Sequence, residues 1–281
     1  MKMTSTLGVS IGAMAILSIS AAADRPIAQE ATAPAPAISP AQLKAALAVS
    51  YLKGAAPRSL TLLPAPPAPG SVAQARDDAA AKAAVALNGA PRWKQAVSDA
   101  DLSFPHAANT FSCALGVEAS KTNTPHLYRL LAGSLIDVGL STYPTKTKYQ
   151  RVRPFVVNST PTCTPGQEAL LRRDGSYPSG HSAIGWGWAL ILTEAAPDRA
   201  DAILARGRAF GESRVVCNVH WLSDTEEGRV IAAATVAKLN SVPEFRADVD
   251  AARAEILAAR AAGHSPTRDC AAEAVALAGE P

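Results

Sequence analysis

Alanine dominates this chain: it occupies 60 of the 281 positions, whereas Phe, Trp and Tyr together make up 5%. Alanine has the highest intrinsic helix propensity, and strands favour β-branched and aromatic side chains. No stretch of useful length alternates apolar and polar residues as a half-buried strand does, and no segment repeats. We therefore predict an all-α fold, a single-domain helical bundle.

Capping residues and prolines indicate where the helices begin. Ser71 is predicted to cap a helix that runs to Gly89, and Thr124 followed by Pro125 marks the start of another. Further helices are expected to begin at His181, Asp198, Ser223 and about residue 246.

Residues 1–23 have the pattern of a secretory signal peptide. Lys2 is a short basic segment, residues 7–19 are apolar, and residues 21–23 are alanines typical of a cleavage site. A membrane anchor is the alternative, but the apolar stretch is too short to span roughly 30 Å of hydrocarbon. We expect a periplasmic or secreted protein. After the signal we predict a flexible Pro/Ala-rich leader at 24–38, an all-helical domain at 39–262 and an Ala-rich tail at 263–281.

Charge and hydropathy exclude two classes of partner. The formal net charge is +3, and no run of Lys and Arg is long enough to indicate binding to a nucleic-acid polymer. No later segment reaches about 18 uninterrupted apolar residues, so we expect no membrane association once the signal is removed.

The chain has four cysteines: Cys113, Cys163, Cys217 and Cys270. An even number of cysteines in an exported protein predicts two disulfides, with three possible pairings. Four buried free thiols are the alternative. No C-x-x-C pair is present, which argues against a structural zinc site.

The first polar cluster is the basic stretch from Lys146 to Arg153, followed by Pro154. Arg and Lys side chains match phosphate oxygens. Lys146 and Arg153 are seven residues apart, so two turns of one helix would place them on the same face. On this interpretation Pro154 ends the helix, and Lys148 and Arg151 lie on the solvated surface. An ordinary exposed basic helix gives the same pattern.

The second cluster is Tyr177-Pro178-Ser179-Gly180-His181, a turn that leads into an apolar helix. Free N–H groups at a helix N-terminus attract anions, and Gly180 allows a ligand to approach the backbone. Ser179 adds a hydroxyl donor and His181 a titratable group. An ordinary helix cap with an incidental histidine is equally compatible with this cluster alone.

The third cluster places Ser213 and Arg214 before His220, and Asp224 four residues after that histidine. A carboxylate at this spacing can hold one imidazole nitrogen and leave the other free to attack phosphorus. A buried structural hydrogen bond is an alternative. A metal-ligand pair is a weaker one, because no third ligand is near.

Taken together, the clusters read K-x6-R-P, P-S-G-H and S-R-x5-H-x3-D, in that order. This resembles the three-part signature of the type 2 phosphatidic acid phosphatase superfamily, which includes vanadium haloperoxidases. Over roughly residues 50–265 the chain is similar to one branch, the class A bacterial non-specific acid phosphatases. The segments that carry this closer similarity are 51–53, 59–67, 175–181 and 213–217.

The resemblance implies a role for each matched residue. His220 would be the nucleophile, Asp224 would orient it, and His181 would act as general acid and then as base. The phosphoryl oxygens would be held by Lys146, Arg153, Ser179, Gly180 and Arg214. It also implies that no metal or other cofactor is needed, that the protein is a homo-oligomer, and that Cys163 pairs with Cys217, which leaves Cys113 with Cys270.

The resulting hypothesis is an exported broad-specificity acid phosphatase that acts on small phosphomonoesters through a phosphohistidine. Two alternatives use the same residues: a vanadate-dependent haloperoxidase, and an exported phosphate-binding protein without catalysis. A pure binding protein needs no acid–base pair, so the presence of both His181 and His220 with Asp224 argues against the last alternative.

Overall fold

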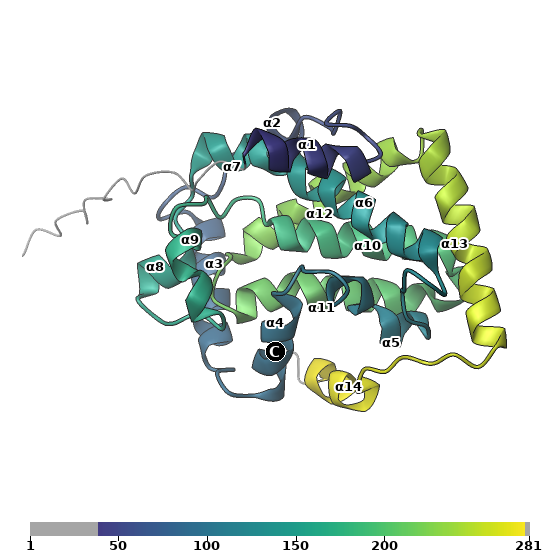
Figure 1. Ribbon diagram of the computed structural model, residues 1–281. Coiled ribbons are helices and arrows are strands. Elements are labelled where there is room, and N and C mark those ends of the chain that lie inside the picture. The colour runs from purple at the N-terminus through teal and green to yellow at the C-terminus, as the bar shows by residue number, and fades with distance from the viewer. Residues whose placement is uncertain (1–38, 279–281) are drawn as a thin grey trace, which may run out of the picture. The chain divides into compact units, whose positions relative to one another are not determined.

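The computed structural model describes residues 39–278, which lie in the compact unit Ala33–Pro281 and contain helices but no strand. This confirms the prediction of an all-α fold. The signal peptide predicted at 1–23 and the leader at 24–38 lie outside the described residues. With the labels of Figure 1, the helices are α1 (Pro40–Val49), α2 (Ser59–Leu62), α3 (Val72–Val85), α4 (Pro91–Asp99), α5 (Ser112–Leu115), α6 (Pro125–Ser141), α7 (Tyr143–Tyr149), α8 (Pro154–Asn158), α9 (Glu168–Leu171), α10 (Gly180–Ala195), α11 (Ala200–Val216), α12 (Leu222–Leu239), α13 (Pro243–Ala261) and α14 (Cys270–Ala278).

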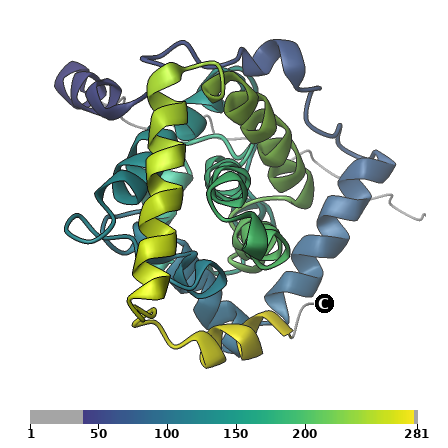
Figure 2. The same cartoon turned by 90° about the vertical axis from the view of Figure 1, so that its right-hand side faces the viewer.

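Helices α10 and α11 lie side by side at the centre of the bundle, seen nearly end-on in Figure 2. A short 3₁₀ turn, Pro197–Arg199, joins them. Helices α6, α12 and α13 pack against α10, and α3 and α4 pack against α11. The N-terminus of α10, the C-terminus of α11 and the N-terminus of α12 therefore meet at one end of the bundle.

Small residues allow the two central helices to approach closely. A Cβ atom added at Gly185 of α10 would overlap the ring of Phe210, and one added at Gly207 of α11 would overlap the side chain of Ala189. Beside this contact, the buried ring of Trp188 meets Phe111 edge-on, with centroids 6.3 Å apart. The alanines and glycines at this interface thus fix the spacing of α10 and α11.

The predicted helix starts are largely correct. The Ser71 Oγ accepts a hydrogen bond from the Gln74 N–H at 3.1 Å, and Pro125 is the first residue of α6. The cap predicted at Ser223 is wrong, because Trp221 is the N-cap of α12 and the Ser223 hydroxyl donates to Asp77 at 2.6 Å.

The single helix expected from Lys146 to Arg153 is also wrong. Helix α7 ends at Tyr149, and Gln150 has a left-handed backbone conformation with φ 42°. Arg153 is extended and caps α8, in which Pro154 is the first residue. The residue before a proline is disfavoured in the α conformation, so the helix could not continue through Arg153. Lys146 and Arg153 therefore come from different elements and not from one helix face.

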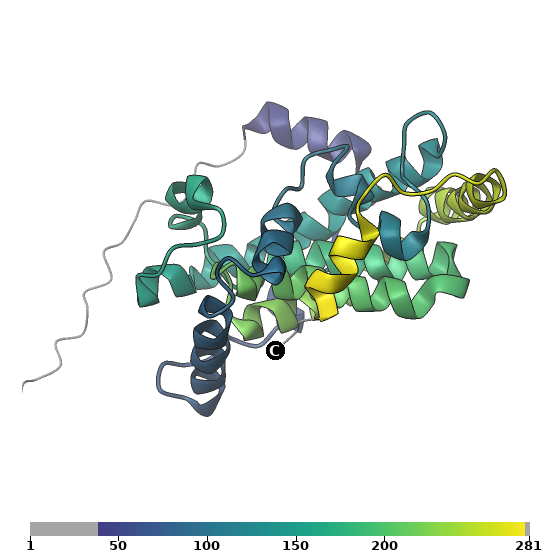
Figure 3. The ribbon, with the colours of Figure 1, turned by 90° about the horizontal axis from the view of Figure 1, so that it is seen from below.

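Two disulfides join distant parts of the chain, and their pairing is the expected one. Cys163 pairs with Cys217 at the end of α11, with Cα atoms 4.7 Å apart. Cys113 pairs with Cys270 at the start of α14, with Cα atoms 5.5 Å apart. The segment expected to be a tail thus carries a helix that packs against α4 (Figure 3). Within residues 39–278, no helix has the length and apolar character needed to cross a membrane.

Gly207→Ala should destabilise the protein by about 1–3 kcal/mol, because the new methyl group meets Ala189 at the contact between α10 and α11. Gly139→Ala in α6 is the matched control. Its new Cβ would lie 3.5 Å from the nearest atom of Ile184, an ordinary contact, so it should be neutral or stabilising by up to about 1 kcal/mol. Urea unfolding of both variants checks this. Equal stability of the two variants would show that the helix spacing is not limited at Gly207.

Candidate active site

His220 and Asp224 form a buried pair at the junction of α11 and α12. The His220 Nδ1 lies 3.2 Å from the Asp224 Oδ2, which also accepts the Trp221 N–H at 2.9 Å. The Arg153 Nη1 donates to the other ring nitrogen, Nε2, at 3.0 Å. A nitrogen that accepts from a guanidinium carries no proton, so this geometry fits a neutral imidazole protonated at Nδ1.

The electrostatic surroundings favour the same neutral form. His220 is 3% exposed, and burial is the largest cause that lowers its pKa well below the ordinary value. The positive charges of Arg153, Lys146 and Arg214 lower this pKa further. An incoming group would therefore meet an unprotonated Nε2, once it takes the place of the Arg153 donor at that nitrogen.

Three buried cations surround this histidine. Lys146 lies in the last turn of α7, Arg153 directly precedes α8, and Arg214 lies in the last turn of α11. The Lys146 Nζ donates to the Gly175 carbonyl at 2.5 Å, and the Arg153 Nη2 donates to Asp174 at 3.0 Å. Burial lowers the pKa of Lys146 to about 8 and that of Arg214 to about 9.

Arg214 differs from the other two cations in its hydrogen bonding. It is 1% exposed, yet its Nε and Nη1 atoms have no hydrogen-bond partner among residues 39–278. A buried guanidinium without a partner is strongly unfavourable unless an anion binds to it. This unsatisfied donor set is therefore the clearest indication of an anion site in the described structure.

The N-terminus of α10 lies next to these groups. Ser179 is the N-cap, and its Oγ accepts hydrogen bonds from the Ser182 N–H at 3.2 Å and the Ser182 hydroxyl at 2.9 Å. The Ser179 N–H donates to the Asp224 carbonyl at 2.9 Å, which fixes α10 against α12. Ser179 and the N-terminus of a 16-residue helix thus lie beside Asp224, the partner of His220.

His181, in the first turn of α10, is held differently from His220. Its Nε2 lies 3.1 Å from the Ala100 carbonyl just beyond α4, and its ring stacks on Phe210 with centroids 6.4 Å apart. Burial and the charge of Arg214 lower the pKa of His181 well below its ordinary value. Its remaining nitrogen, Nδ1, carries no hydrogen bond to a described residue.

The structure thus brings together all eight residues predicted for the site, and it adds carboxylates that the sequence analysis missed. Asp174 pairs with Arg153 at 3.0 Å and lies 3.6 Å from Lys146. Asp99 accepts from the Ser213 hydroxyl at 2.6 Å and pairs with Arg206.

Arg151 was expected on the solvated surface, and this expectation is wrong. Its side chain is only 9% exposed and pairs with Asp224 and Asp77, at 2.7 Å in each case. An extended conformation for residues 151–153 would have predicted the buried position of Arg151, because side chains two residues apart on an extended segment point to the same side. On that prediction, Arg151 lies on the same side of the chain as Arg153 and faces the site.

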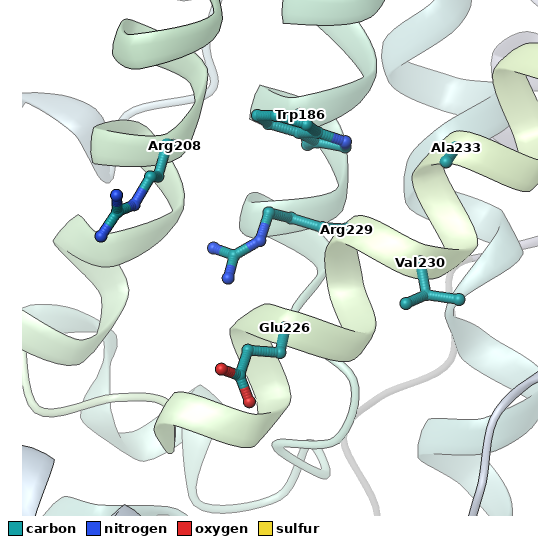
Figure 4. Close-up of a pocket in the computed structure, with 6 residues that line it drawn as sticks. All are labelled: Trp186, Arg208, Glu226, Arg229, Val230 and Ala233. Atoms are coloured by element: carbon teal, nitrogen blue, oxygen red, sulfur yellow. The ribbon is translucent and has the colours of Figure 1, made fainter.

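No metal site of the usual type is present among residues 39–278: they contain no group of three or more His, Cys, Asp or Glu side chains that could hold an ion. One pocket of about 380 Å³ lies away from the site, between α10, α11 and α12 (Figure 4). It includes none of the predicted site residues. Its lining residues are Trp186, Arg208, Glu226, Arg229, Val230 and Ala233.

Comparison with known proteins agrees with this arrangement. Residues 127–246 match the model of the PAP2 superfamily, and this span contains all eight predicted site residues. A non-specific acid phosphatase of Providencia stuartii is 42% identical over 73% of this chain and 84% of its own length. An acid phosphatase of Zymomonas mobilis is 40% identical over 74% of this chain and 78% of its own length. A non-specific acid phosphatase of Salmonella typhimurium is 41% identical over 69% of this chain and 78% of its own length. The chain belongs to the PAP2 superfamily, among its acid phosphatases, which confirms the family resemblance seen in the sequence.

Proposed function

We propose that this chain is an exported, broad-specificity acid phosphatase that hydrolyses phosphomonoesters through a phosphohistidine at His220, without a metal ion. The observation that carries the proposal is the geometry of His220, whose Nδ1 faces Asp224 and whose ring is buried among three cations. The names of the relatives, acid phosphatase and non-specific acid phosphatase, support the reaction class.

In the first step, the phosphoryl group of the substrate binds between Lys146, Arg153 and Arg214. The His220 Nε2 attacks phosphorus, an N–P bond forms and the P–O bond to the leaving alcohol breaks. His181 donates a proton to the departing oxygen. The negative charge spread over the phosphoryl oxygens is stabilised by the three cations and by the N-terminus of α10.

In the second step, water attacks the phosphohistidine. His181 now accepts a proton from the water, the N–P bond breaks, and phosphate and neutral His220 are regenerated. His181 must be protonated before the first step, although its pKa in the ligand-free site is low. A bound phosphoryl anion favours the imidazolium, and acidic pH supplies the proton. Both effects support an acidic optimum.

Export is part of the proposal on two grounds. The pattern of residues 1–23 is that of a signal peptide, and two disulfides among the described residues are typical of an oxidising compartment. We propose a periplasmic or secreted enzyme that acts on small phosphomonoesters.

Arg214→Met should abolish stabilisation by inorganic phosphate. For the unmodified protein, phosphate at 100 times its Kd should add about 2.7 kcal/mol to the free energy of unfolding, and so raise Tm by several degrees. The variant should show no such rise, because the unpaired guanidinium is the group that phosphate satisfies. Arg208→Met on the same helix, which replaces an exposed arginine paired with Glu212, is the control and should respond like the unmodified protein. An undiminished phosphate effect in Arg214→Met would place the anion elsewhere.

His220→Ala should lower kcat on p-nitrophenyl phosphate by about 10⁴-fold or more, because no other group can form the covalent intermediate. His264→Ala, at an exposed histidine, should keep full activity. EDTA should leave the unmodified enzyme unaffected. Turnover in the His220→Ala protein at a rate close to that of the unmodified enzyme, or loss of activity in EDTA that a divalent ion restores, would contradict the proposed mechanism.

His181→Asn should slow the reaction according to the leaving group. With p-nitrophenyl phosphate, the phenolate leaves without a proton, so the variant should release one equivalent of nitrophenol rapidly and then accumulate phosphoenzyme. With an alkyl phosphate, which needs protonation of the departing oxygen, the first step itself should be slow. Rapid-quench kinetics on both substrates separate these cases. An equal loss on both substrates without a burst would remove His181 from the role of general acid.

A further inference from the structure

Arg151 connects the candidate nucleophile to a second buried carboxylate. Its Nη1 donates to the Asp224 Oδ1 at 2.7 Å, and its Nη2 donates to the Asp77 Oδ2 at 2.7 Å. Asp224 uses its other oxygen for His220. A continuous chain of charge-assisted hydrogen bonds therefore runs from Asp77 through Arg151 and Asp224 to the imidazole.

Asp77 holds this chain from helix α3. It is 1% exposed, and its two oxygens also accept from the Ser223 N–H at 2.8 Å and the Ser223 hydroxyl at 2.6 Å. The Gln74 side chain of α3 accepts from Arg151 as well, at 2.8 Å. The guanidinium is thus fixed on three sides, and its face lies over the Trp221 ring, 5.3 Å from the centroid.

Arg151 lies between the Asp224 and Asp77 carboxylates, within hydrogen-bond distance of both. A full carboxylate charge directed at Nδ1–H would favour the imidazolium, whose Nε2 cannot attack phosphorus. Burial raises the pKa of Asp224, and Arg151 opposes this by favouring the ionised carboxylate, while its positive charge offsets part of the field of that carboxylate at His220. Asp77, on the other side of the guanidinium, weakens this offset. The other charged or titratable groups around His220 come from α7, the segment before α8, the loop before α10, α10 itself and α11: Lys146, Arg153, Asp174, His181 and Arg214.

We propose that Arg151, held by Asp77, is a positioning residue for the phosphatase reaction: it fixes the Asp224 carboxylate and shares its charge, so that His220 remains an unprotonated nucleophile in acid. This inference rests on the proposed function, in which His220 is the nucleophile. It predicts that charge removal at Arg151 and at Asp77 affects the nucleophile in opposite directions.

The test follows the rate of nitrophenol release in the first turnover, measured by rapid mixing from about pH 2.5 to 8, because this rate reports the attack by His220 and the range includes a strongly lowered pKa. The acid limb of the profile marks the protonation of that imidazole. In Arg151→Gln, the uncompensated Asp224 charge should raise the pKa of His220 and move the limb upward by about one pH unit. In Asp77→Asn, no Asp77 charge offsets that of Arg151, so the pKa of His220 should fall and the limb should move to lower pH.

Two further variants separate positioning from a merely structural role. Arg151→Lys keeps the charge but cannot bridge both carboxylates, so its limb should stay near that of the unmodified enzyme while the burst rate falls several-fold. Arg76→Gln is the matched control: Arg76 also links α3 to α12, through Glu226, but it is 57% exposed and does not touch Asp224. Its profile should be unchanged.

Opposite displacements in Arg151→Gln and Asp77→Asn support the inference. The inference is overturned if neither limb moves, or if both limbs move in the same direction and Tm falls in both variants. Arg151 would then serve only as a structural link between α3 and α12. If Arg151→Gln does not fold, Asp77→Asn decides the question. A downward shift of its acid limb, relative to Arg151→Lys and Arg76→Gln, supports the inference, and an unmoved or raised limb overturns it. Full activity of His220→Ala would instead refute the proposed nucleophile, so the two failures are distinguishable.

Discussion

The structure is organised around a buried excess of positive charge. Lys146, Arg153 and Arg214 are each at most 4% exposed, and they converge on one histidine. Removing three cations from water is costly, and part of this cost is not offset within the protein, because two donor atoms of Arg214 have no hydrogen-bond partner among residues 39–278. An anion with several oxygens would supply the missing hydrogen-bond acceptors, and this is the physical basis on which we propose a phosphoryl site here.

Buried cations that repel one another stay together only if the surrounding helices cannot move apart, and the two central helices are held in this way. The glycine and alanine contacts between α10 and α11 set the distance between the two helix ends that carry His181 and Arg214. Buried carboxylates complete the scaffold at its edges: Asp99 bonds Ser213 beside Arg214, Asp174 pairs with Arg153, and Asp77 with Arg151. The Cys163–Cys217 disulfide fixes the chain three residues after Arg214.

The alanine-rich composition and the capping residues were enough to predict the helical fold, and the family resemblance carried by the three motifs led to the eight proposed site residues. The supporting network was not predictable in the same way. Arg151 was misplaced because the basic stretch was read as one helix, whereas Gln150 ends α7 in a left-handed conformation. Asp77 and Asp99 lie far from the motifs in sequence, and no spacing rule connects them to Asp224 or Ser213. Only the packing of α3 and α4 against the central helices brings these carboxylates to the site.

Arg153 and Arg214 lower the pKa of both histidines, but the two rings have different hydrogen-bond partners. His220 has a carboxylate at Nδ1 and a guanidinium at Nε2, so its neutral form has one fixed tautomer. His181 has only a neutral carbonyl at Nε2, and its Nδ1 has no fixed partner among the described residues. A bound phosphoryl group adds negative charge next to both rings. Under the proposed mechanism, phosphorus replaces the Arg153 donor at the His220 Nε2, so the proton attracted by that charge goes to His181. In the mechanism that we propose, the hydrogen-bond partners of the two rings, more than their electrostatic surroundings, therefore distinguish the nucleophile from the acid.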